Sequence, residues 1–189
     1  MTNSQTITIS DEQIIKSTED WLVKAVIGLN LCPFAKPVHL RKAIRFVVSK
    51  AHDEESVMND LADELIYLSE ADSKVCETTL LILPKILSDF VDFNDFMELA
   101  DQLLEEMDLT GTFQIANFHP LYQFAGTEPN DIENYTNRSP YPILHLIREA
   151  SIEEALKSVR NPDEIFENNI STMKNLGHDG WRKLMMDGF

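Results

Sequence analysis

The sequence has no apolar run that approaches the roughly 20 residues of a membrane-spanning helix. Its beginning, MTNSQTITISDEQ, lacks both the basic region and the apolar region of a secretory signal peptide. Composition is that of a globular protein, with 43% hydrophobic and 25% charged residues. We therefore expect one cytoplasmic domain over 1–189, with a flexible tail at 1–9 and no membrane partner.

Cysteine is scarce, and so are the motifs of familiar catalytic sites. The two cysteines, Cys32 and Cys76, form neither a disulfide framework nor a short zinc-ligand spacing. A zinc site from Cys32, His119 and His145 would use suitable ligand types, but no short spacing supports it. The chain also lacks a phosphate-binding glycine loop, a GxSxG elbow and an HExxH helix. No metal ligands are predicted, and the cofactor is unknown.

Acidic residues are absent from one long segment that is rich in cations. The whole chain carries a net charge of −16, which argues against a nucleic-acid partner, because such binding depends on cations. Residues 21–52 contain no Asp or Glu and carry +6, so the rest of the chain carries −22. This basic window has two interpretations. It is either counter-charge that moderates self-repulsion, which we favour, or an anion-binding surface around Cys32.

The hydrophobic pattern predicts an α/β fold, with α+β as the alternative. A helix begins at Ser10 and ends near Gly28, and a loop follows to Lys42. Strands are expected at 43–49, 78–83, 112–118 and 142–148. Later helices are expected to begin at Asp53, at Asp92 or Asn94, at Ser151 (to Val159) and at Pro162 (to Gly177), with a last short one at 176–185. The result is a four-stranded mixed sheet in the order β-α-β-α-β-β with an N-terminal helix and C-terminal helices, a thioredoxin-like or ferredoxin-like order.

Two connections are long enough to suggest a site. Loops 29–42 and 119–141 lie near and beyond the usual limit for a structureless connection in a compact domain. The second ends in SPYP, where Ser139-Pro140 and Tyr141-Pro142 are consecutive X-Pro bonds. Either bond could be cis, and Tyr141-Pro142 is the preferred candidate. The alternative for this loop is an ordered Ω-type structure with no binding role.

Particular side chains in and beside these loops have suitable chemistry. Arginine presents a fork of donors that matches an anion, so Arg138 and Arg148 are predicted to hold an anionic substrate. His119 is the candidate general acid or base. Cys32 is the candidate nucleophile or redox thiol, because nearby cations activate a thiol. The predicted substrate-binding set is Arg138, Arg148, Asn137 and Tyr122. The alternatives are arginines paired with nearby acids and a Cys32 that is simply a small buried apolar residue.

Four segments resemble a known family in the right order. They are GLNLCPFA (28–35), FHPLYQFAGT (118–127), TNRSPYPILHLIREASI (136–152) and LGHDGW (176–181). They are similar to an uncharacterised domain-of-unknown-function family, the family numbered 1415. The resemblance implies a bacterial cytoplasmic protein of about this length. It implies no reaction, substrate or catalytic residue.

Three functional hypotheses follow. The first is an enzyme that acts on a small anionic substrate, at a site between loops 29–42 and 119–141. This hypothesis requires Cys32, His119 and Arg138 to converge. The second is a non-catalytic module that binds a protein partner, and the third is a protein with a structural metal site.

Overall fold

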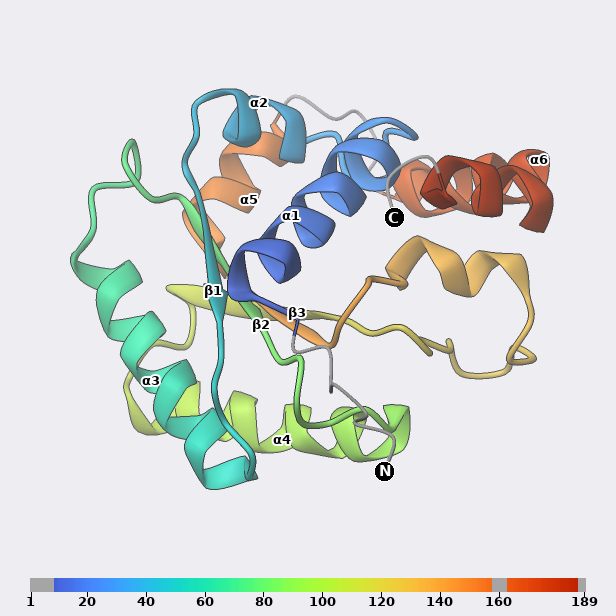
Figure 1. The fold of residues 1–189 in the computed structure, drawn as a ribbon. Helices are drawn as coiled ribbons and strands as arrows, with labels where there is room; N and C mark the ends of the chain where they lie inside the picture. Colours follow the sequence, from blue (N-terminus) through green and yellow to red (C-terminus); the bar gives the residue numbers. More distant parts are fainter. Residues whose placement is uncertain (1–8, 158–162, 187–189) are drawn as a thin grey trace, which may run out of the picture.

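The computed structural model describes residues 9–157 and 163–186, and a four-stranded sheet forms its centre (Figure 1). The strands are β1 (Ile44–Val48), β2 (Thr78–Ile82), β3 (Phe113–Phe118) and β4 (Ile143–Arg148). Their spatial order is β1-β2-β4-β3. β1 and β2 are parallel, and β4 is antiparallel to both β2 and β3. The predicted mixed sheet and its order along the chain are confirmed.

Helices cover both faces of this sheet (Figure 1). One face packs against α3 (Glu54–Glu70) and α4 (Phe90–Glu106). The other packs against α1 (Asp11–Trp21), the π-helix η1 (Leu22–Ile27) and the C-terminal half of α6 (Asp163–Met186). The shorter helices are α2 (Ala35–Leu40), the 3-10 helix η2 (Ile132–Asn137) and α5 (Glu149–Leu156). No helix among the described residues is long and apolar enough to cross a membrane.

The side chains of β2 alternate between two faces of the sheet, and both faces are buried, which explains its continuous apolar sequence. All five residues of β2 are buried. Leu81 packs with α3 and α4, whereas Leu80 and Ile82 pack with α1 and η1. A central strand with helices on both sides has no solvent face, so its sequence need not alternate. The same alternation assigns each residue of β3 and β4 to one face of the sheet.

The first helix begins as predicted and then changes its geometry. Ser10 and Gln13 form a reciprocal capping box. From Leu22 the backbone forms a π-helix, in which each hydrogen bond joins residues five apart. For example, the Gly28 N–H donates to the Val23 carbonyl at 2.9 Å. Trp21 therefore lies where the α-helix widens into a π-helix, a feature that often occurs at functional sites.

Loop 29–42 contains helix α2, which the sequence analysis did not predict. Pro37 had argued against any helix in this segment, but it is the third residue of α2. A proline is tolerated in the first turn, because the N–H groups there have no partner within the helix. The predicted long loop is therefore a short connection followed by a helix.

Two helix starts also differ from the prediction. α4 begins earlier, at Phe90, because Asp89 accepts the N–H groups of Val91 and Asp92. α5 begins at Glu149, directly after β4 and without a side-chain cap, so Ser151 lies inside the helix. Residues 1–8, Val159 and Pro162, on which other predictions fell, lie outside the described residues.

Helix α6 bends where the sequence predicts a helix end. Gly177 has φ 63° and ψ 174°, which is not helical. Glycine adopts a positive φ without the steric cost of a Cβ. The bend makes two helical segments of α6 and brings Trp181 and Met185 of the second against the core of α1 and η1.

Candidate functional site

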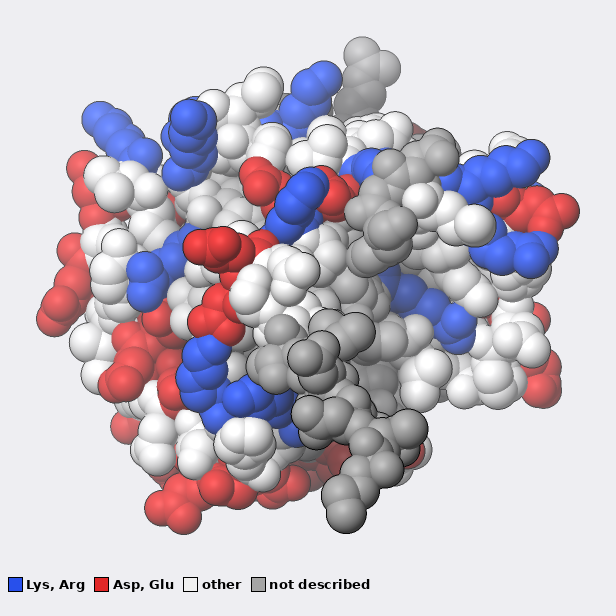
Figure 2. Space-filling model, in the orientation of Figure 1, with Lys and Arg blue, Asp and Glu red and all other residues white. Residues whose placement is uncertain are grey.

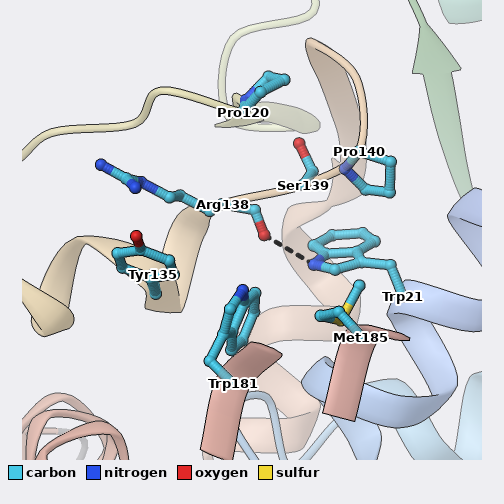
Figure 3. Close-up of a pocket in the computed structure, with 8 residues that line it drawn as sticks. All are labelled: Trp21, Pro120, Tyr135, Arg138, Ser139, Pro140, Trp181 and Met185. Atoms are coloured by element: carbon cyan, nitrogen blue, oxygen red, sulfur yellow. Dashed lines mark hydrogen bonds between the residues drawn. The ribbon is translucent and has the colours of Figure 1, made fainter. Parts of the chain in front are cut away.

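A pocket lies where α1, the 119–141 loop and the second segment of α6 meet (Figure 3). Its volume is about 230 Å³. Most of its walls are rings and other apolar groups, and Arg138 is the one charged residue among those that line it. The lining residues are Trp21, Pro120, Tyr135, Arg138, Ser139, Pro140, Trp181 and Met185.

Trp21 joins α1 to the loop across the floor of this pocket. Its indole Nε1–H donates to the Arg138 carbonyl at 2.7 Å (Figure 3). On its other side, the Trp21 ring meets Phe118 of β3 edge to face, with 5.1 Å between centroids. Trp21 is 2% exposed, so a hydrogen bond in these surroundings is costly to break. The bond fixes the backbone at Arg138 against the helix.

The loop around the pocket is ordered by its own side chains. Asn134 of η2 is completely buried. Its amide oxygen accepts from Phe124 N–H at 3.0 Å and Thr127 Oγ1 at 2.8 Å, and its amide nitrogen donates to the Glu128 carbonyl at 2.8 Å. No peptide bond among the described residues is cis, so neither Ser139-Pro140 nor the preferred candidate Tyr141-Pro142 is a cis bond. Asn134 rather than a cis proline determines the loop's form.

The Arg138 guanidinium lies at the rim of the pocket, over the Tyr135 ring (Figure 3). Its central carbon is 4.1 Å from the ring centroid. Nε donates to the Tyr122 carbonyl at 3.3 Å, and Nη2 donates to the Pro129 carbonyl at 2.6 Å. Arg138 forms no ion pair with any carboxylate of the described chain. Two of its five N–H groups are thus used, and the remaining donors can bind an anion.

Asn137 and Tyr122, two other predicted substrate-binding residues, lie beside Arg138. The Asn137 carbonyl accepts the His119 N–H at 3.2 Å. Tyr122 contacts Phe90 and Phe124 through its ring. Burial raises the pKa of the Tyr122 phenol, and a hydrogen bond with the Asn137 side chain offsets part of that increase. Neither residue lines the pocket, so both support Arg138 from behind.

His119 is also close to Arg138, but both of its ring nitrogens are occupied. Nδ1 accepts the Leu121 N–H at 3.0 Å, so the proton resides on Nε2, which donates to the Leu87 carbonyl at 3.0 Å. The ring is fully buried against Phe90 and Phe93. Burial lowers the pKa of His119, and the hydrogen bond to Leu87 and the Asp89 charge oppose this only in part. In this arrangement His119 has no free nitrogen with which to exchange a proton with a ligand.

Cys32 is not near His119. Cys32 packs with the core of α1 and η1, whereas His119 contacts α4 on the opposite face of the sheet. Burial raises the pKa of the Cys32 thiol, and hydrogen bonds from the Phe34 and Ala35 backbone only partly offset this. The thiol is therefore protonated at neutral pH rather than activated. The structure does not bring Cys32, His119 and Arg138 together, and the 29–42 segment contributes no residue to the pocket.

Arg148 is likewise far from Arg138. Arg138 precedes β4 and Arg148 is its last residue, so the length of the strand, roughly 20 Å, separates them. Nη2 of Arg148 donates to the carbonyls of Leu68, Ala71 and Cys76, at 2.5, 2.8 and 3.2 Å. These carbonyls belong to the end of α3 and the connection that follows it. Arg148 thus fastens α3 to the sheet, and the expected meeting of two arginines does not occur.

The basic window supplies counter-charge more than an open anion site. Three of its six cations form ion pairs with acids from outside the window. Figure 2 shows acidic side chains concentrated at the lower left, over α3 and α4, and basic ones along the upper edge and near α6. The pairs are Arg41 with Glu77, Arg45 with Glu64 and Lys50 with Asp11.

The hypothetical zinc ligands are also separated. His145 lies on the α1 face of β4, where Nε2 is 2.8 Å from Thr78 Oγ1, and His119 lies on the other face. Among residues 9–157 and 163–186, no three or more His, Cys, Asp or Glu side chains form a group that could hold a metal ion.

Sequence reasoning missed three of the pocket's walls. Trp21 has the pattern of an ordinary core position of the first helix, and Trp181 and Met185 lie 40 and 44 residues beyond the end of the loop. One signal was available. The LGHDGW segment (176–181) contains both the bend at Gly177 and Trp181.

Comparison with known proteins identifies the family but no activity. A family model described as a protein of unknown function, DUF1415, matches residues 13–183. No curated protein and no solved structure matches the chain. The match covers the sheet, every residue that lines the pocket except Met185, and most of α6, and the chain belongs to this family.

Proposed function

We propose that this member of the family binds a small organic anion in the pocket beside Arg138. The observation that carries the proposal is the free hydrogen-bonding capacity of Arg138 at the mouth of an apolar pocket. The chain has 32 acids and only 16 Lys and Arg residues. An arginine at the rim that pairs with no carboxylate of the described residues is therefore a candidate to bind the carboxylate of a ligand. The apolar part of the ligand would occupy the interior, and its anionic group would lie at the rim.

The lining residues favour binding over chemistry. None of them is a histidine, a cysteine or a carboxylate. Ser139 has a hydroxyl, but it donates to the Tyr141 carbonyl at 2.5 Å and no base lies against it in the described structure. The predicted anionic ligand is therefore retained in this proposal, whereas the predicted roles of Cys32 and His119 as nucleophile and base receive no geometric support.

The experiment replaces Arg138 and measures binding of two monocarboxylates, cyclohexylacetate and phenylacetate. Both tryptophans of the chain line the pocket, so intrinsic fluorescence reports its occupation directly. Wild type should bind at least one of the two. Arg138→Ala should weaken that binding at least tenfold, because a charge-assisted bidentate hydrogen bond is lost.

A matched control separates this local effect from net charge. Arg41→Ala removes the same charge from the half-exposed Arg41–Glu77 pair and should leave binding unchanged. Arg138→Ala should reduce the free energy of unfolding by only about 1–2 kcal/mol, since two hydrogen bonds to carbonyls are lost. If neither carboxylate binds wild type, or if Arg138→Ala binds as well as wild type, the proposed function is wrong.

A further inference from the structure

We infer that the ligand is a carboxylate with a single aromatic ring, held with its ring against Trp21 and Trp181 and its carboxylate at Arg138. This inference rests on the proposed function and specifies its ligand class. Three properties of the pocket carry it, namely the nature of its walls, its size and its polarity.

The walls are ring systems that face a common space. Trp21 projects from α1 and Trp181 from α6, with Met185 between them in the view of Figure 3. Tyr135 meets Trp181 edge to face, with 5.5 Å between centroids. No ring contact joins Trp21 and Trp181 in the described chain, although both line the pocket, so a guest ring can contact both. Aromatic pairs prefer such offset or edge-to-face contacts, and a thioether also contacts ring edges favourably.

The size of the pocket suits a guest of one ring with a short side chain. A cavity of roughly 150 Å³ lined by apolar side chains holds benzene. The present volume of about 230 Å³ adds room for a carboxylate and one or two further atoms.

The polar groups of the walls select against other ligand classes. The Trp21 N–H and the Ser139 hydroxyl are already bonded to backbone carbonyls, so a sugar or polyol would leave its hydroxyls unpaired inside. Two tryptophans and a tyrosine could also surround a quaternary ammonium ion. The Arg138 guanidinium at the rim repels such a cation and attracts a carboxylate instead.

The test compares four probes on the full-length chain by tryptophan fluorescence and, independently, by equilibrium dialysis. Phenylacetate should bind most tightly. Cyclohexylacetate has the same charge and similar bulk but no aromatic ring, and it should bind roughly tenfold more weakly. Acetate, which lacks the ring, and tetramethylammonium, which has the opposite charge, should not bind in the same concentration range.

Two substitutions on the exposed side of the pocket test the wall itself. Trp181→Phe keeps an aromatic ring and should retain the preference for phenylacetate over cyclohexylacetate. Trp181→Leu should reduce that preference at least threefold while the Arg138-dependent affinity for cyclohexylacetate persists. Trp181 is partly exposed, and a change there is less disruptive to folding than one at the buried Trp21.

The outcomes distinguish the two claims. Equal affinity for cyclohexylacetate and phenylacetate, with both lost in Arg138→Ala, would overturn the aromatic ligand class and leave the proposed anion site intact. Binding of tetramethylammonium in preference to phenylacetate would also overturn the ligand class. Failure of every carboxylate to bind would refute the proposed function itself.

Discussion

At the residue scale, His119 has the sequence features of a catalytic residue but a structural role in the fold. A histidine next to a long loop is a reasonable general base. Here its ring bridges the loop after β3, through Leu121 N–H, and the loop before α4, through the Leu87 carbonyl. Leu87 has φ 55°, a conformation that this hydrogen bond helps to hold. The ring joins two loops and has no free atom for a substrate.

This role predicts a pH-dependent contribution to stability. The pKa of His119 is lower in the folded chain than the ordinary value of 6.5, chiefly through burial. Below pH 6.5 the unfolded chain therefore takes up a proton that the folded chain does not, and the free energy of unfolding decreases as the pH falls. His119→Gln should cost roughly 2–3 kcal/mol near neutral pH, because two buried backbone groups lose their partner. That deficit should shrink as the pH is lowered.

Urea denaturation at a series of pH values between about 7.5 and 5 measures this effect as the difference between variant and wild type. Carboxylate titrations common to both chains cancel in that difference. His52→Gln, the same substitution at an exposed position, serves as the control for the loss of a histidine. A deficit in His119→Gln that stays constant with pH would mean that the pKa of His119 is not lowered in the folded state.

At the element scale, the end of α3 depends on a side chain from a distant strand. α3 has no basic residue in its last turn, where a cation would compensate the helix dipole. Arg148 of β4 supplies that cation and donates to carbonyls at and beyond the helix end. The helix and the sheet are therefore joined by an interaction between residues 80 apart in the sequence.

Replacing Arg148 should separate stability from binding. Arg148→Met keeps much of the apolar contact but leaves three carbonyls without their donor, and it should reduce the free energy of unfolding by about 2–4 kcal/mol. Carboxylate binding at the Arg138 pocket should be unchanged, which is the reverse of the Arg138→Ala pattern. Chemical denaturation and the fluorescence titration measure the two effects. A loss of carboxylate affinity in a folded Arg148→Met variant would mean that Arg148 contributes to binding as well as to stability.

At the scale of the whole molecule, the large negative net charge opposes the stability of the folded state. A net charge of −16 repels itself in the compact state, and the acidic surface over α3 and α4 concentrates that repulsion (Figure 2). The six ion pairs of the described chain lie mainly at exposed positions, where each contributes little. Screening should therefore weaken the repulsion more than it weakens the pairs.

Added salt is accordingly expected to stabilise the fold. The free energy of unfolding, measured by urea denaturation at neutral pH, should rise as sodium chloride is raised from about 0.01 M to about 0.15 M, where the Debye length falls from about 30 to 8 Å. Sucrose at matched osmolality is a control for effects other than screening. A decrease in stability with salt would mean that local ion pairs outweigh the net repulsion.

Much of the fold followed from local sequence features. The caps at Ser10 and Asp53 and the apolar run of β2 predicted their elements, because hydrogen bonding at helix ends and burial on both faces leave a direct imprint on neighbouring residues. The helix at Pro37 and the start of α4 at Asp89 were missed, since the rule applied to proline holds for helix interiors and several acids compete as caps near residue 90.

The sequence by itself indicated which loop forms the centre of the site and which of its residues lie near Arg138. It indicated that 119–141 is unusually long, and Arg138, Asn137 and Tyr122 do lie together there. Local chemistry makes this possible, because Asn134 and η2 fold the loop on itself within a short stretch of chain.

Only the tertiary structure decided which distant residues join that loop. The face of the sheet on which a residue lies separates Cys32 from His119, and the length of β4 separates Arg138 from Arg148. The bend at Gly177 turns α6 so that Trp181 meets Tyr135. Such contacts depend on strand register and helix packing between residues far apart in the chain, and no local pattern of residues encodes them.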